Sequence, residues 1–142
     1  MDRRMRKALQ EIVNLSEERK LFLALDSFQA LLPAFGRFDP AHRGVYLICT
    51  VFSTAAAADG TLTTQEYALI AALMKAETGS DFSRDEVLEL VKAAGNKYHI
   101  IQQLAESLND DEKAKLITLI AVICSIDDTI TTEEIDYIDS LF

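Results

Sequence analysis

The stretch AAAADGTLTTQE at residues 55–66 decides how the fold is understood, because a close copy, ICSIDDTITTEE, occupies residues 123–134. A shift of 68 positions places residues 45–74 over residues 113–142. The identical pairs include Asp59/Asp127, Thr63/Thr131 and Glu66/Glu134. The chain therefore contains an internal repeat, and each copy joins an apolar segment to a second segment through an acidic turn.

Each copy predicts a helix, a turn and a second helix. The apolar segments have helical periodicity, and the T-x-x-E patterns at Thr63–Glu66 and Thr131–Glu134 are typical of capping boxes that begin helices. Neither second helix can bury its apolar stripe alone. We therefore expect two helix-turn-helix repeats with acidic DG-type turns, packed against each other about a pseudo-twofold axis.

The rest of the chain also predicts helices, so the expected fold class is all-α, a compact bundle of about seven helices. Its length, with 49% hydrophobic residues, suits a single domain over residues 1–142. Pro33 and Gly36 predict that the second helix ends near Leu32. The other expected boundaries are a first helix over residues 3–15, helix starts at Thr63, Ser83, Asn109 and Thr131, helix ends at Gly79 and Gly95, and a helix over residues 96–108.

The pair of acidic turns resembles the A-x-A-D-G-x-I-x-x-x-E turns of TerB-like domains, which are associated with tellurite resistance. The resemblance spans about residues 45–142 and departs from the pattern at Asp128, which stands where the pattern has Gly. It implies a compact cytosolic helical bundle that serves in bacterial stress systems against metal oxyanions, phage and colicins. It also implies a protein partner, with membrane-linked proteins among the candidates, and no enzymatic activity.

The acidic turns have two interpretations that the sequence leaves open. Aligned with an EF-hand loop, each turn lacks carboxylates at the first and third positions, so neither can complete a calcium shell of six to eight oxygens from its own side chains. The turns could serve only to end one helix and cap the next. They could instead bind a divalent cation such as Ca²⁺ or Mg²⁺ weakly, with no cofactor required. The candidate metal ligands are Asp59, Glu66, Asp127, Asp128 and Glu134.

Charge is distributed unevenly along the chain, which has a net charge of −9. Residues 1–44 hold 8 Lys/Arg and 6 Asp/Glu, whereas residues 45–142 hold 6 and 17. An acidic body repels phosphate backbones, so nucleic-acid binding is not expected, and cations or basic protein surfaces are the expected partners. The basic start, with Arg3, Arg4, Arg6 and Lys7, suits either a surface helix or contact with an anionic membrane.

No motif predicts catalysis. His42 and His99 have no nucleophile or carboxylate at catalytic spacing, and the glycines form no phosphate-binding loop. The alternative that we keep is a metal-dependent hydrolase that uses the two acidic turns. No apolar run reaches the length of a membrane span, and Cys49 and Cys124 suit reduced thiols in a core, so we expect a cytoplasmic protein.

Overall fold

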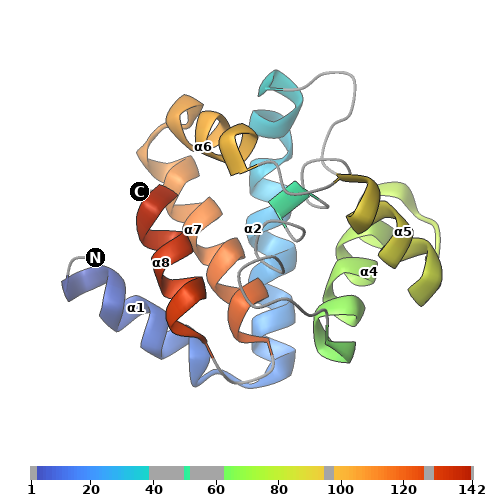
Figure 1. Cartoon of the computed structure of the whole chain (residues 1–142), viewed down its shortest axis with the longest axis horizontal. Helices are drawn as coiled ribbons and strands as arrows, with labels where there is room; N and C mark the ends of the chain where they lie inside the picture. Colours follow the sequence, from blue (N-terminus) through green and yellow to red (C-terminus); the bar gives the residue numbers. More distant parts are fainter. Residues whose placement is uncertain (1–2, 39–49, 52–62, 95–97, 127–129, 142) are drawn as a thin grey trace.

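The computed structural model describes residues 3–38, 50–51, 63–94, 98–126 and 130–141, and every element in this part of the chain is an α-helix (Figure 1). The predicted all-α bundle of about seven helices is confirmed. The helices are α1 (Arg3–Val13), α2 (Glu17–Phe38), α4 (Thr64–Thr78), α5 (Arg84–Ala94), α6 (Tyr98–Ser107), α7 (Asp110–Ser125) and α8 (Thr132–Leu141).

The core is built around α7, whose second half is buried on every side. Residues 119–126 form an unbroken run of buried positions, which is the pattern expected of a helix enclosed by others. α2 packs along α7 most extensively, and α1 and α8 also pack against it (Figure 1). α4 and α5 lie side by side beyond α2, and α6 contacts both α2 and α8.

The prediction that α2 ends near Leu32 was wrong, because the helix continues through Pro33 and Gly36 to Phe38. Pro33 is exposed, so the backbone groups that it leaves unbonded face water. Two residues later, Phe35 is completely buried, and its ring centroid lies 6.1 Å from that of Phe28. Burying such a side chain contributes about 1.5–3 kcal/mol, which offsets most of the roughly 3 kcal/mol that proline costs within a helix.

The predicted helix starts are confirmed by four capping boxes. In each, a Ser, Thr or Asn side chain accepts from the backbone N–H three residues on, and the Glu at that position accepts from the backbone N–H of the capping residue. The pairs are Thr63/Glu66, Ser83/Glu86, Asn109/Glu112 and Thr131/Glu134. Gly79 ends α4 with φ of +76°, in the left-handed conformation predicted for it.

The second helices of the two repeats, α4 and α8, begin in the same way and bury equivalent residues. Ile70 and Ile138 are both completely buried, and Glu66 and Glu134 are 4% and 3% exposed. Only Thr50 and Val51 of the first apolar segment belong to the described residues. The superposition of the whole repeats therefore stays a prediction.

Two further sequence expectations concern cysteines and membrane spans. Cys124 is a buried thiol in α7 and is not part of a disulfide in the described structure, whereas Cys49 lies outside the described residues. Within the described ranges, no helix is both long enough and apolar enough to cross a membrane.

Candidate functional site at the acidic end of the bundle

Three helices begin at the same end of the bundle, where α7 ends. The N-termini of α2, α4 and α8 lie at the bottom of Figure 1, beside the C-terminus of α7. A groove of about 310 Å³ between α2, α4 and the end of α7 is lined by Glu17 and Leu21 of α2, Gln65 and Leu69 of α4, and Ile126. Helix N-termini carry a partial positive charge, so acidic side chains are stabilising here. We refer to this region as the acidic end.

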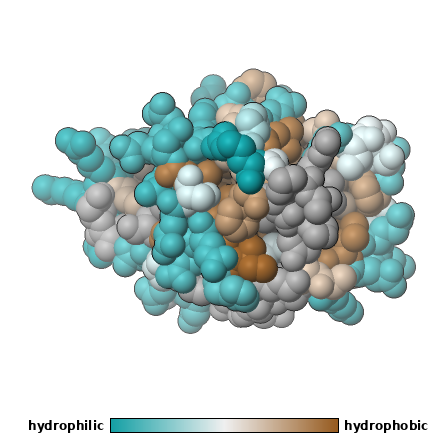
Figure 2. All heavy atoms as spheres, turned by 90° about the horizontal axis from the view of Figure 1, so that it is seen from above, coloured by the Kyte–Doolittle hydropathy of each residue, from teal (hydrophilic) through white to brown (hydrophobic). Residues whose placement is uncertain are grey.

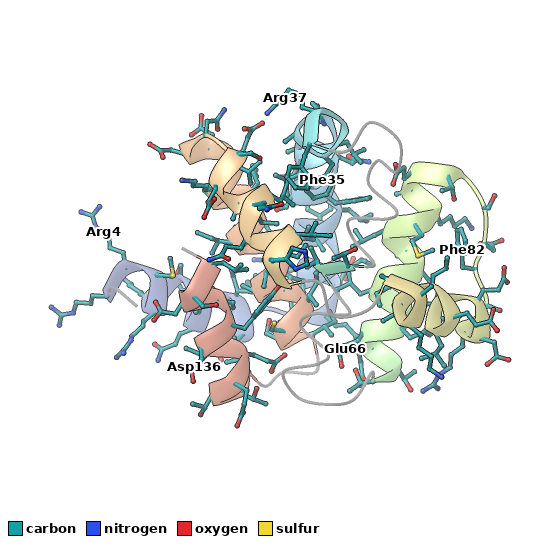
Figure 3. The ribbon with its side chains drawn as sticks, turned by 45° about the horizontal axis from the view of Figure 1, so that its top comes forward. Arg4, Phe35, Arg37, Glu66, Phe82 and Asp136 are labelled. Carbon is teal, nitrogen blue, oxygen red and sulfur yellow. The ribbon has the colours of Figure 1, made fainter. Side chains whose placement is uncertain are left out.

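Glu66 and Glu134 are the two predicted ligands that the structure describes. Both lie at the acidic end, and both are buried. The Oε1 atom of Glu66 accepts from the Thr63 backbone N–H at 3.0 Å, and that of Glu134 accepts from Thr131 at 2.9 Å. Figure 3 shows Glu66 on the first turn of α4. One oxygen of each carboxylate is therefore committed to holding a helix start.

Asp59, Asp127 and Asp128 lie outside the described residues, as do the carbonyls around Thr61 and Thr129 that a cation would also need. Within the described part of the chain, no group of three or more His, Cys, Asp or Glu side chains is arranged to hold a metal ion. The cation interpretation of the turns accordingly stays a prediction, while the capping interpretation is confirmed for Thr63 and Thr131.

A buried lysine lies at the acidic end, and the sequence reasoning missed it. Lys20 is 0% exposed, and its Nζ atom donates to the backbone carbonyl oxygen of Ser125 at 2.5 Å. Ser125 is also 0% exposed, and its Oγ atom has no hydrogen-bond partner among the described groups. The spacing of residues could have revealed it, because Lys20 lies at helical spacing from the buried stripe of Ala24, Phe28 and Leu31.

The outer faces of α8 and α1 carry opposite charges. Glu133, Asp136 and Asp139 recur every three residues along the exposed side of α8. Figure 3 shows Asp136 on α8 and Arg4 extending from the far end of α1. Arg4 and Lys7 are exposed, while Leu9 is buried and contributes to the core. The apolar stripe of α1 therefore packs on the bundle, and its basic side chains face outward.

Polar and charged side chains also cover much of the described surface at the opposite end of the bundle. Figure 2, which looks at this end, shows teal side chains around smaller hydrophobic areas.

Two large hydrophobic side chains of the described residues are exposed, Phe22 at 71% and Leu90 at 36%. Phe22 lines an open groove of about 700 Å³ along the start of α2, together with Leu15 and Leu25.

The fold and the acidic end together define a compact helical module. It combines a packed α-helical core, an acidic end that contains a buried lysine, and an exposed acidic face on α8.

The family model for the tellurite resistance protein TerB matches residues 47–142, which is more than half of the chain. The chain belongs to the TerB family. No curated protein and no solved structure matches it.

Proposed function

We propose that the chain is a non-enzymatic interaction module of a cytoplasmic stress response of the tellurite or metal-oxyanion type, and that it binds the basic surface of a partner protein. The observation that carries the proposal is the row of exposed carboxylates on α8, formed by Glu133, Asp136 and Asp139. Membership of the TerB family supports the stress setting.

The acidic face of α8 suits a protein partner for two reasons. It lies on a short helix whose other side is anchored in the core by Tyr137, Ile138 and Leu141, so the carboxylates are presented on a rigid surface. Charged rows of this kind accelerate association with an oppositely charged partner and exclude like-charged competitors. We expect the partner to present Lys or Arg side chains, and membrane-linked proteins are included among the candidates.

The experiment compares two charge-reversal variants in the native host. Glu133→Lys/Asp136→Lys reverses the charge of the α8 face, and Asp85→Lys/Glu89→Lys reverses the charge of an acidic pair on α5 that is also exposed. We expect the α8 variant to lose the proteins that co-purify with the wild-type chain and to reduce growth on tellurite, while the α5 variant retains both. If both variants retain or both lose the co-purifying proteins, the α8 face is not the binding surface. If growth on tellurite is unchanged after deletion of the gene, the chain has no role in this stress response.

We also propose weak binding of Ca²⁺ or Mg²⁺ at the acidic turns. In its support, the starts of α4 and α8 lie at the same end of the bundle, on either side of α2 and α7, and each helix carries a buried capping carboxylate on its first turn. Carboxylate, carbonyl and water oxygens are the ligands that these cations prefer. The alternative of a metal-dependent hydrolase has no observation in its favour among the described residues, so we do not propose it.

A further inference from the structure

A groove between α1 and the start of α8 combines an apolar lining with a basic edge. It has a volume of about 550 Å³, and its apolar lining comes from Leu9 and Val13 of α1 and from Ile130 and Ile135. Val13, Ile130 and Ile135 are only half-buried, so part of this apolar surface still faces water. Arg6 lines the groove on the α1 side. Covering the groove would therefore remove further apolar surface from water, which favours association.

The two helices that border the groove carry opposite charges. Arg3, Arg6 and Lys7 are exposed on α1. Asp136 is exposed on α8 and directly follows Ile135, which lines the groove. α1 and α8 lie on the same flank of the bundle (Figure 1, Figure 3). In the described structure, none of these four charged side chains forms an ion pair. Both charges are therefore available to a second molecule.

We propose that this flank binds a second copy of the chain about a twofold axis that passes through the groove. Such an axis places Arg6 of each copy opposite Asp136 of the other and brings the two apolar linings together. A twofold contact uses the same patch on both copies, and protein interfaces generally have an apolar centre and a polar rim. The proposal gives the α8 face a specific basic partner, so it rests on the docking role proposed for that face.

Charge complementarity favours a second copy over other occupants of the groove. A partner that presents only Lys and Arg would be repelled by Arg3, Arg6 and Lys7, and an anionic membrane would be repelled by Asp136, because like charges in contact are costly. A surface that carries both charges in the same arrangement satisfies both edges, and this chain presents one. Although the net charge is −9, residues 1–44 are net positive and residues 45–142 are net negative. The contact pairs the positive part of one copy with the negative part of the other.

Sedimentation of the purified chain in low salt tests the proposal. We expect an equilibrium between monomer and dimer, with a dissociation constant that rises about tenfold or more between roughly 0.05 and 0.5 M NaCl, because salt screens exposed charges. A chain that stays monomeric at every concentration in low salt overturns the proposal. The docking role proposed for α8 would survive that result, because it is tested separately by the host proteins that co-purify with the chain.

Charge reversal at each edge tests which residues face the second copy. Arg6→Glu and Asp136→Lys should each raise the dissociation constant of the dimer at least about tenfold, because the twofold axis repeats each repulsive contact. Arg4→Glu is the matched control on α1, since successive helix positions turn by about 100° and Arg4 therefore lies on the opposite side of the helix from Arg6. Glu89→Lys is the control for the carboxylate, because Glu89 is exposed on α5. Controls that weaken the dimer as much as the test variants would overturn the proposal.

An equimolar mixture of the Arg6→Glu and Asp136→Lys variants tests the pairing itself. In the mixed dimer the reversed α1 edge of one variant meets the reversed α8 edge of the other, and the two remaining edges are wild type. Both contacts are then attractive, so the mixed dimer should form with a dissociation constant within roughly threefold of the wild-type value. If the two variants stay monomeric when mixed, the two edges do not face each other and the proposal fails.

Discussion

Arg37 and Glu112 connect the end of α2 to the start of α7, with 2.7 Å between Nη2 and Oε2. Glu112 is at the same time the Glu of the Asn109 capping box. The hydrogen bond from Arg37 and the backbone hydrogen bond from Asn109 hold the pKa of Glu112 below its usual value of 4.5. A single carboxylate therefore begins α7 and joins it to α2.

This geometry predicts a pH-dependent contribution to stability. Since the pKa of Glu112 is lower in the folded chain than in the unfolded chain, the carboxylate stabilises the fold above the unfolded pKa, and this contribution is lost as the pH falls through the folded pKa. Glu112→Gln should therefore be less stable than the wild type at pH 7, and the difference should shrink below about pH 4.5. Urea denaturation across this range measures it. A difference that is constant from pH 7 to pH 3 would contradict the assignment.

The capping boxes predict that equivalent substitutions in the two repeats lower the free energy of unfolding by similar amounts. Thr63→Ala and Thr131→Ala each remove the hydroxyl that accepts from the third backbone N–H of the helix, and each should cost about 1 kcal/mol. Thr64→Ala and Thr132→Ala are the controls, because these side chains are exposed at the first helical position. Chemical denaturation that gives equal losses for caps and controls would show that the hydroxyl bonds contribute nothing.

Two glycines predict opposite effects of the same substitution. Gly79→Ala places a Cβ atom on a residue with φ of +76° and should cost about 1–2 kcal/mol. Gly36→Ala introduces a Cβ atom that has no neighbour within 4 Å, in the last turn of α2. It should stabilise the fold by about 0.5–1 kcal/mol. Thermal unfolding of the two variants checks the sign, and a stabilising Gly79→Ala would contradict the left-handed cap.

The cation proposal predicts weak binding that depends on both turns. Titration with Ca²⁺ and Mg²⁺ should give dissociation constants on the order of 0.1–1 mM or weaker, with the second turn the tighter because it carries more carboxylates. Asp59→Asn and Asp127→Asn should each weaken one site. NMR titration or calorimetry gives the measurement. If millimolar Ca²⁺ shifts no resonance at either turn, or if neither variant alters the titration, the turns serve only to end one helix and cap the next.

The sequence predicted best where the structure depends on contacts between neighbours in the chain. The capping boxes at Thr63 and Thr131 and the left-handed Gly79 involve residues three or four positions apart, and all were confirmed. The continuation of α2 through Pro33 was missed because the burial of Phe35 in the core outweighs a local helix-breaking preference.

The candidate site was only partly predictable for the same reason. Glu66 and Glu134 were found through their repeated spacing, and the structure brings both to the acidic end. Lys20 was missed because its significance depends on α7, a helix distant in sequence that covers it. A charged residue in register with the apolar stripe of α2 was the available signal.

The packing of α2 on α7 has a consequence for synthesis of the chain. Lys20 and Ser125, which meet in the folded protein, are 105 positions apart. At translation rates of about 5–20 residues per second, α2 emerges several seconds before the helix that covers it. During that interval Phe28, Leu31 and Phe35, all completely buried in the finished fold, have no α7 to pack against. The nascent chain should therefore be a substrate for ribosome-associated chaperones until its last third has been made.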